Sequence, residues 1–478
     1  MYKSKLIHLF ALLSASQRLG LRKWLQSPAH NQREDLWALW RYMEEQGPEA
    51  PPKSWEKARV FRAVFGRTYS KEEDSLLRYA QSFLLQAIEE FLIAEQLEEQ
   101  PLYKAELLAQ AYQKIGLSKH LKQQSQKWER QLERQSERGT AYRKGQYALA
   151  KLRYQEEAKA GKSRNAPKNL PALGHWLDSE YRLRKLRQAC LFLAHQAVYK
   201  TQYDFGLLPA VLAQIEAHEE LLEDKALALY YHCYRLQSSL EAEEDFRKFK
   251  ALLLSEKNIL PADQLRELYQ LGINFCTKQV NLQRPGYEQY FEEMFALYRA
   301  ELSENLLLEQ GQISPFAFKN IVSVGLWLKA YDWVSQFVTA YENCLPQAYQ
   351  AAYARFSWAK LALEKEQYEK AQELLLQQEF ADLFMQLNAR VMLLKIYYAL
   401  EEFDLLESFL ASFRAFVNRK KRAQKLRSYH QENYLNIISF CRKLLQLNPY
   451  DRQEKKNLRQ QIEDCSILTE RRWFLQQL

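Results

Sequence analysis

The chain has 478 residues, well beyond the size at which one globular core stops growing, so we expect several domains or an extended array. It contains only 13 Gly and 13 Pro. Because sheets and phosphate-binding loops need Gly for their tight turns, this scarcity favours long helices joined by short turns. No apolar run reaches the roughly 18–20 residues of a membrane span, which argues against a membrane protein.

Residues 1–118 predict an N-terminal helical region. A first amphipathic helix, rather than a signal peptide, is favoured by the one-face spacing of Leu6, Leu9, Phe10 and Leu13. Ser70 and Glu73 form a capping-box pattern, so we expect a long helix to begin there. Gly116 predicts the end of the helix that starts at Leu102.

Residues 119–171 are predicted to form a basic helical hairpin followed by a loop. Between residues 119 and 168 there are 14 basic and 5 acidic residues, so this segment accounts for the whole net charge of +9. Basic groups can neutralise phosphates, and the interleaved Tyr142, Tyr147 and Tyr154 can stack on bases, as single-stranded nucleic acids require. The candidate nucleic-acid patch consists of Lys127, Arg130, Arg134, Arg138, Arg143 and Lys144.

The same segment also fits a solvated helix without a ligand. Glu129, Glu133 and Glu137 alternate with the arginines at a spacing that permits pairs within one helix. Charge pattern alone does not separate these two interpretations.

The motifs of common active sites are incomplete in this chain. Gly161-Lys162-Ser163 lacks the first Gly of a phosphate loop, because Glu156 occupies its place. His218-Glu219 lacks the second His of a zinc-protease helix, because Leu222 stands there. The six Cys form no CxxC pair, which favours reduced core thiols of a cytoplasmic protein. We therefore expect neither an enzyme nor a cofactor or metal site.

Residues 172–450 predict an array of helical pairs, including helices over 287–308, 316–328 and 334–341. Three stretches share one pattern, in which an aromatic precedes an acidic residue and an apolar residue follows three positions after the aromatic. The aromatics are Tyr331, Tyr368 and Phe403, which are 37 and 35 residues apart. A period of this length is typical of stacked helical pairs. We expect the three aromatics to be packing residues of that stack.

These stretches resemble the tetratricopeptide-repeat family. Ala362, Tyr368 and Ala371 match its small residue, aromatic and second small residue, and Gly325 with Tyr331 matches in part. Val334 and Leu406 depart from the small residue of the pattern. The resemblance implies an all-α fold, an α–α superhelix of antiparallel hairpins, with residues 451–478 supplying a capping C-terminal helix.

Stacked helical pairs more often form binding surfaces than active sites. The leading prediction is a non-enzymatic scaffold or adaptor that binds a protein or peptide on the concave face of the array. Polar or amphipathic residues on the first helix of each pair are candidates for this groove: Asn320, Trp327, Lys360, Arg390 and Lys395. The alternative is a protein that binds RNA or single-stranded DNA through residues 119–168.

Overall fold

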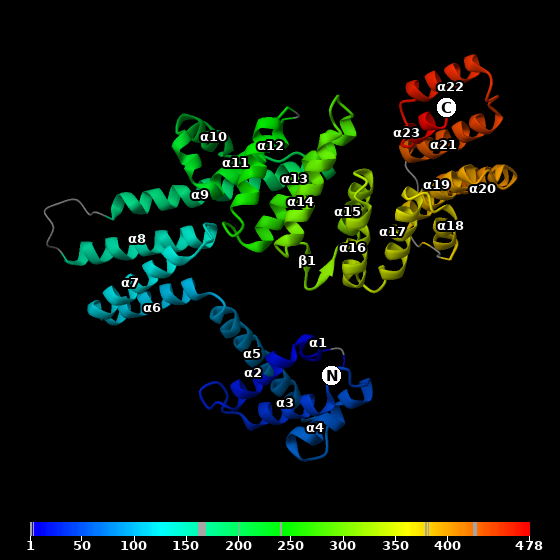
Figure 1. The fold of residues 1–478 in the computed structure, drawn as a ribbon. Helices are drawn as coiled ribbons and strands as arrows, with labels where there is room; N and C mark the ends of the chain where they lie inside the picture. Colours follow the sequence, from blue (N-terminus) through cyan, green and yellow to red (C-terminus); the bar gives the residue numbers. More distant parts are fainter. Residues whose placement is uncertain are drawn as a thin grey trace. The chain divides into compact units, whose positions relative to one another are not determined.

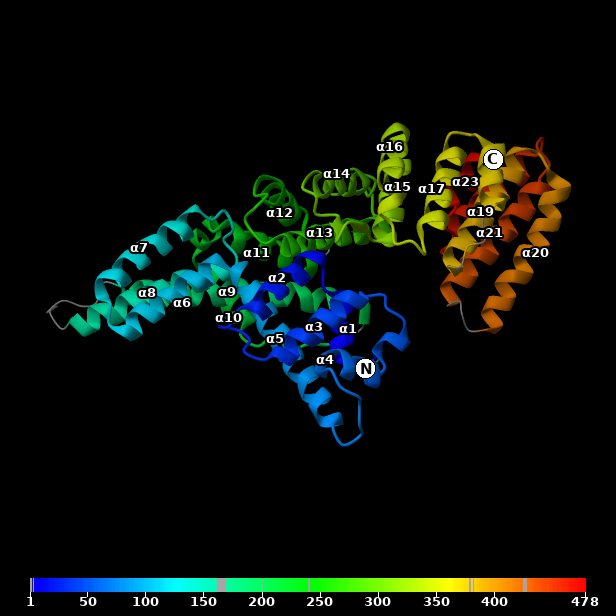
Figure 2. The same cartoon turned by 90° about the horizontal axis from the view of Figure 1, so that it is seen from below.

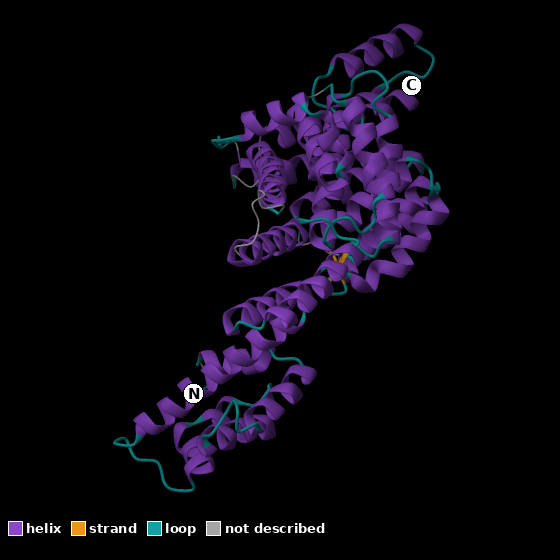
Figure 3. Cartoon of the chain, turned by 90° about the vertical axis from the view of Figure 1, so that its left-hand side faces the viewer, coloured by secondary structure: helices purple, strands orange, loops and turns teal. Residues whose placement is uncertain are grey.

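The structure, a computed structural model, describes residues 2, 4–160, 169–199, 201–239, 241–377, 380, 382–423 and 428–478. Helices dominate these residues, and the strands among them form one short hairpin (Figure 3). The expected all-α class is thus confirmed. Most of the predicted loop at 161–171, including Gly161-Lys162-Ser163, lies outside the described residues.

The chain divides into two compact units, Met1–Tyr181 and Arg182–Leu478, which we call unit 1 and unit 2. Helix α9 (Leu170–Tyr199) contains the boundary between them. The four segments expected from the sequence, 1–118, 119–171, 172–450 and 451–478, stay a prediction.

Unit 1 contains two buried clusters. The first joins α1 (Lys5–Leu12), α2 (Ala15–Gln26), α3 (Glu34–Gln46), η1 (Pro52–Trp55), α4 (Lys57–Phe65) and α5 (Asp74–Glu98). Its largest fully buried side chains include Phe10, Trp40 and Trp55. The second cluster joins α6 (Pro101–Ile115), α7 (Ser118–Arg134) and α8 (Thr140–Ala160) around Trp128 and Leu132.

The capping box expected at Ser70 does not form. Helix α5 begins at Asp74, and the residue before it, Glu73, makes no side-chain capping bond. The Asp74 carboxylate instead accepts hydrogen bonds from Lys57 Nζ at 2.7 Å and from Tyr69 Oη at 2.8 Å. Contacts with α4 and with the connecting loop therefore define the start of this helix, and Ser70 takes no part in it.

Unit 2 is a succession of helices that runs in chain order (Figure 1). Its first half contains α10 (Leu208–Ala217), η2 (Glu219–Glu223), α11 (Lys225–Ser238), α12 (Glu243–Ser255), α13 (Ala262–Leu282), α14 (Gln289–Ser303), β1 (Leu308–Glu309) and β2 (Gln312–Ile313). Its second half contains α15 (Pro315–Trp327), α16 (Tyr331–Tyr341), η3 (Glu342–Cys344), α17 (Gln350–Glu364), α18 (Tyr368–Leu376), α19 (Leu383–Ala399), α20 (Phe403–Arg422), α21 (Ser428–Gln446), α22 (Arg452–Asp464) and α23 (Arg471–Gln476).

Helices of unit 2 pack mainly on their neighbours in the sequence. The pairs α11–α12, α13–α14, α15–α16, α17–α18 and α19–α20 are joined by contacts between successive first helices, such as α15–α17 and α17–α19. Figure 2 shows α15, α16 and α17 side by side. Two buried clusters follow one another and meet on α17, where Leu361 belongs to the first and Phe356 to the second. This sequential packing is consistent with a helical array.

The three stretches with the repeated pattern form the same turn. Two positions after the end of the first helix, a residue adopts a positive φ: Lys329 (58°), Glu366 (57°) and Glu401 (55°). The next N–H then bonds back to the carbonyl five residues earlier, as Ala330 to Gly325 (2.9 Å), Gln367 to Ala362 (2.8 Å) and Glu402 to Tyr397 (3.0 Å). This Schellman arrangement satisfies the last carbonyls of the first helix. The second helix begins at the following residue, which is the aromatic in all three cases.

Packing between the two helices of each pair depends most on the residue three positions after the aromatic. Val334, Ala371 and Leu406 are fully buried, at 0% exposure each. Tyr331 and Tyr368 are half-buried, whereas Phe403 is 45% exposed. Phe403, at the start of its helix, still packs edge-on against Tyr398 of α19, with ring centres 6.0 Å apart. All three aromatics thus contribute to packing, Phe403 the least of them because nearly half of it is exposed.

The helix expected over 287–308 ends early. Helix α14 stops at Ser303, Asn305 adopts a φ of 55°, and β1 and β2 pair through a turn in which Gln310 and Gly311 both have positive φ. That turn suits the right-handed twist of a two-residue hairpin connection. The apolar residues of this stretch, Leu306 and Leu307, are buried on the first cluster, which explains their helix-like sequence pattern.

The C-terminal segment packs on the second cluster of unit 2. Leu458 of α22 and Phe474 of α23 are buried in it. Thr469, just before α23, is held by Asn433 of α21 through two hydrogen bonds, at 2.8 and 3.1 Å. Trp473 and Phe474 of α23 pack on Tyr398 of α19 and Phe440 of α21. The C-terminal helices thus cover apolar surface of α19 and α21, as the cap of a helical array requires.

Gly325 permits the close approach of α15 and α16. A Cβ atom at this position would stand 2.5 Å from Cγ2 of Val334, a β-branched side chain with little rotamer freedom. We expect Gly325→Ala to destabilise the protein by about 1–3 kcal/mol, seen as a lower midpoint in thermal unfolding followed by circular dichroism.

The matched control is Gly174→Ala in α9, where an added Cβ meets no atom within 4 Å. There the lower entropy of the unfolded chain should stabilise by about 0.5–1 kcal/mol. Equal midpoints for Gly325→Ala and the wild type would contradict the tight crossing.

Candidate functional site

The cations predicted from the basic segment divide into two groups. Lys127, Arg130 and Arg134 on α7 and Lys144 on α8 have exposed side chains. Within the part of the chain that the structure describes, none of these four makes an ion pair or a side-chain hydrogen bond. These four residues therefore stay candidate ligands for phosphate.

Arg138 has a structural role instead. Its guanidinium donates hydrogen bonds to the carbonyl of Leu132 in the last turn of α7 (3.5 Å) and to that of Glu137 in the following segment (3.4 Å). It also lies 4.4 Å from the centre of the Tyr142 ring. A cation is stabilising at a helix C-terminus, where carbonyls lack partners within the helix. Arg138 is therefore a cap of α7, and its predicted role in the patch is withdrawn.

Arg143 is buried within unit 1. Its side chain is 2% exposed, and its guanidinium donates a hydrogen bond to the hydroxyl of Ser179 on α9. The neighbouring residue, Lys144, points to solvent, because consecutive residues of a helix lie about 100° apart around its axis. Arg143 thus links α8 to α9 and cannot contact an external phosphate.

The glutamates of α7 do not pair along their own helix as the alternative interpretation expects. Glu129 accepts two hydrogen bonds from Arg153 of α8, at 2.8 and 2.6 Å. This bidentate pair lowers the pKa of Glu129, chiefly through its hydrogen bonds. Because one arginine of α8 neutralises this glutamate, the cations of α7 are left available on their helix face.

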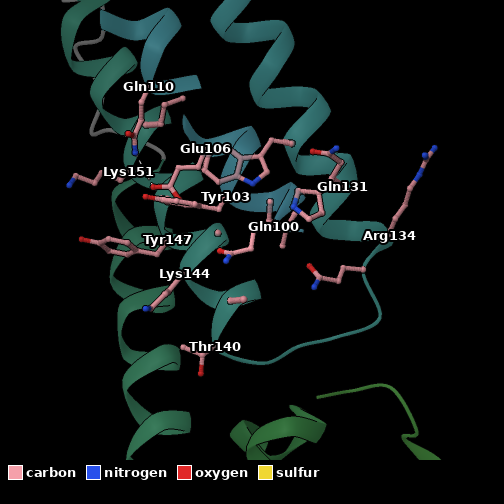
Figure 4. Close-up of a pocket in the computed structure, with 18 of the residues that line it drawn as sticks. Gln100, Tyr103, Glu106, Gln110, Gln131, Arg134, Thr140, Lys144, Tyr147 and Lys151 are labelled. Atoms are coloured by element: carbon pink, nitrogen blue, oxygen red, sulfur yellow. Dashed lines mark hydrogen bonds between the residues drawn. The ribbon is translucent and has the colours of Figure 1, made fainter. Parts of the chain in front are cut away.

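A cavity of about 1370 Å³ lies between α6, α7 and α8. In Figure 4, Lys144, Tyr147 and Lys151 project from α8, and Tyr103 and Glu106 of α6 point toward them. On the α7 side the walls include Trp128, Gln131, Arg134 and Gln135. The cavity thus combines aromatic rings, amides and a basic rim.

Polar atoms without partners are concentrated on this cavity. The indole nitrogen of Trp128 and the amide oxygens of Gln131 and Gln135 are buried and make no hydrogen bond among the described residues. A buried polar atom without a partner costs about 1–3 kcal/mol. All three residues line the cavity; Trp128 and Gln131 lie on α7, and Gln135 is the residue that ends it. A ligand with donor and acceptor groups would satisfy them.

Two acidic residues line the cavity, Glu99 at the end of α5 and Glu106 on α6. Burial raises the pKa of the Glu106 carboxyl, and Lys151 acts in the opposite direction. Lys151 lines the same cavity and favours the charged form of the Glu106 carboxyl. The remaining Lys144 and Arg134 keep the rim basic.

The predicted groove residues lie on α15, α17 and α19, and most of them contact the chain itself. Trp327 stacks on Phe291 with ring centres 3.9 Å apart. Lys395 forms an ion pair with Glu470 at 2.5 Å and lies 5.7 Å from the Trp473 ring. These two side chains therefore support packing of the array and of its C-terminal segment.

The other three groove residues are more varied. Lys360 donates a hydrogen bond to the hydroxyl of Ser323 at 3.0 Å, and burial lowers its pKa. Arg390 lies 4.3 Å from the centre of the Phe416 ring, and burial together with Arg419 lowers its pKa. Asn320 is exposed.

Comparison with known proteins identifies no relative. No family model matches the chain, no curated protein is similar to it, and no solved structure matches it. Among the described residues, no helix has the length and apolarity to span a membrane. In the same residues, no three His, Cys, Asp or Glu gather as a metal site would require.

Arg143 and Lys144 are adjacent cations with opposite burial, which gives a direct test of their roles. Arg143→Ala should destabilise the protein by about 2–3 kcal/mol, because it removes a buried, charged hydrogen-bond donor. Lys144→Ala should change stability by less than about 0.5 kcal/mol. Thermal unfolding of the two variants measures the difference, and equal midpoints would show that Arg143 is not a structural link.

Proposed function

We propose that unit 1 binds single-stranded nucleic acid in the cavity between α6, α7 and α8. The observation that carries this proposal is that three kinds of group line one cavity. They are cations without an ion pair among the described residues (Arg134, Lys144 and Lys151), aromatic rings, and buried polar atoms without a hydrogen-bond partner. Each of these three groups of residues corresponds to one part of a nucleotide.

The cations are placed to contact a phosphate backbone. On α7, Lys127 and Arg134 are seven residues apart, as are Lys144 and Lys151 on α8, so each row extends roughly 10 Å along its helix. Arg130 lies one turn before Arg134 on the same face of α7. Neutralisation of phosphates by such groups releases counterions, which drives binding to any sequence.

The aromatic side chains are suited to stacking on bases. Tyr103 is 49% exposed and Tyr147 is half-buried, so a base can reach both rings from solvent. Base stacking on an aromatic side chain contributes about 1–3 kcal/mol and tolerates any base.

The unpartnered polar atoms are suited to base edges. Bases carry hydrogen-bond donors and acceptors on their edges, and single strands leave these edges free. The indole N–H of Trp128 can donate, and the amides of Gln131 and Gln135 can both donate and accept. A base in the cavity would satisfy atoms that are otherwise buried without partners.

A second candidate function is the non-enzymatic scaffold that binds a peptide across α15, α17 and α19. One observation favours it: Lys319 of α15 and Lys395 of α19 are both close enough to Lys360 of α17, between them in the row of first helices, to act on its charge. Lys395 already binds the carboxylate of Glu470, so an acidic peptide is the partner that this row of lysines would suit. We also infer that the hairpins of unit 2 are tetratricopeptide-like repeats of an α–α superhelix, on the basis of their three matching turns.

Reversal of charge on α7 tests the nucleic-acid proposal. Lys127→Glu, Arg130→Glu and Arg134→Glu together should weaken binding of labelled single-stranded RNA and DNA roughly tenfold or more at low salt. The dependence of log Kd on log salt should fall by about 2, since each single-strand phosphate contact contributes about 0.7. Fluorescence anisotropy over a salt series measures both quantities.

The matched control reverses three exposed cations of α22, namely Arg452, Lys456 and Arg459. It changes the net charge by the same amount and should bind nearly as the wild type does. The proposal fails if the wild type does not bind at low salt, or if both triple variants bind equally.

Removal of a stacking ring should weaken nucleic-acid binding without changing how the affinity depends on salt concentration. Tyr103→Ala should weaken binding by roughly 5–150-fold, which corresponds to one lost base stack. The slope against salt should stay the same, because no charge is removed. Tyr79→Ala on α5, where the ring is 60% exposed, is the control, and an equal loss in both variants would rule out a specific stack.

A further inference from the structure

A second cavity, of about 1110 Å³, lies within unit 2 and is separate from the proposed nucleic-acid site. Its walls come from α13, α14 and the β1–β2 hairpin, the element that replaced the end of a predicted helix. Four carboxyl groups line it, those of Asp263, Glu267, Glu301 and Glu309, whereas Arg266 is the single cationic residue of its lining among the described residues.

Glu301 is the most enclosed of these carboxyl groups. It is 5% exposed, and it accepts no hydrogen bond within the described chain; Arg266 is the nearby charge that acts on it. Burial accordingly raises the pKa of Glu301 to about 7. A carboxyl this buried needs either a proton or a cationic partner, because an unpaired charge is costly away from water.

Arg266 does not supply that partner. Its Nε donates to the carbonyl of Leu306 at 2.6 Å, and its Nη1 donates to Glu309 at 3.0 Å. These bonds hold the hairpin against α13. Glu267 is likewise engaged, since Arg187 of α9 donates to it at 3.0 and 3.2 Å. Glu301 is thus the acidic group of the cavity that remains without a bonded cation.

The shape of the site favours an elongated cation over a metal ion. No three acidic, His or Cys side chains among the described residues gather closely enough to coordinate a metal, so the carboxyl groups are distributed around the wall. Apolar residues also line the cavity, including Leu271, Ile313 and Ala317. Methylene groups can lie along such walls while a charged end meets a carboxylate.

We propose that this cavity binds an organic cation, an alkylammonium or guanidinium group, with Glu301 as its buried carboxylate ligand. The group belongs either to a free polyamine or to a lysine or arginine side chain of a basic peptide. The more exposed Asp263 and Glu309 attract the cation to the entrance.

Calorimetric titration of the full chain with spermidine, and separately with a short polylysine and a short polyarginine peptide, tests this proposal. At pH 8 the wild type should bind at least one of them, and Glu301→Gln should weaken that binding roughly tenfold or more, as expected when one partner of a buried ion pair is lost. The matched control, Glu288→Gln, removes an exposed carboxylate outside the lining and should have little effect. Tighter binding of spermidine identifies a free amine, and tighter binding of a peptide identifies a side chain.

The pH dependence supplies an independent readout. Glu301 interacts electrostatically with Arg266 and Tyr269 of α13 and with Tyr298 of α14. The other titratable groups of the cavity lining are Asp263, Glu267 and Glu309. As the pH rises from 6 to 8, Glu301 loses its proton, so wild-type affinity should increase several-fold, and Glu301→Gln should lose most of this increase. Asn274→Trp, which places a bulky ring at the exposed rim, should block binding without removing a charge. Absence of binding by the wild type, or equal binding by Glu301→Gln, overturns the proposal.

Discussion

The turn that joins the two helices of each pair is the constraint on which unit 2 depends. A helix with one apolar stripe cannot bury that stripe alone, so its partner must begin within two or three residues and return along it. The left-handed residues Lys329, Glu366 and Glu401 make this return possible, and the bond back to the carbonyl five residues earlier satisfies the end of the first helix. Where Gly325 lies opposite Val334, the absence of a Cβ atom sets how closely the two helices approach.

The helical pairs also determine which charged side chains are available to a ligand. Arg138 and Arg143 lie among the same basic residues as Lys127 and Lys144, but the end of α7 and the hydroxyl of Ser179 use their donors. Similarly, the ammonium group of Lys395 forms an ion pair with the carboxylate of Glu470. Among the described residues, Arg134, Lys144 and Lys151 form no ion pair and line the cavity of unit 1, whereas the buried carboxyl of Glu301 lines the cavity of unit 2. The cavity of unit 1 is therefore suited to an anionic ligand, and the cavity of unit 2 is suited to a cationic ligand.

Periodicity in the sequence was sufficient to predict the helices and the positions of the repeated turns, because both depend on residues close together in the chain. It did not predict that Phe403 stays 45% exposed while Leu406 is fully buried, since that depends on how neighbouring helices cross. The capping box at Ser70 failed because Lys57 and Tyr69 bind Asp74 from another segment. The helix predicted over 287–308 ended too late because the apolar residues after Ser303 continue the helical pattern. The residue that adopts a positive φ there is Asn305, which marks a helix end less clearly than a glycine would. The cavities are formed by residues from three elements, so no local pattern reveals them.

The central claim is that the cavity between α6, α7 and α8 receives single-stranded nucleic acid. Ultraviolet crosslinking of the full chain to a single-stranded oligonucleotide, followed by mass spectrometry of the crosslinked peptides, tests this claim most directly, because it locates the contact without any substitution. We expect crosslinks at Tyr103, Tyr147 or Trp128, in peptides of α6, α7 and α8. Crosslinks confined to unit 2, or no crosslink under conditions in which the oligonucleotide binds, would contradict it.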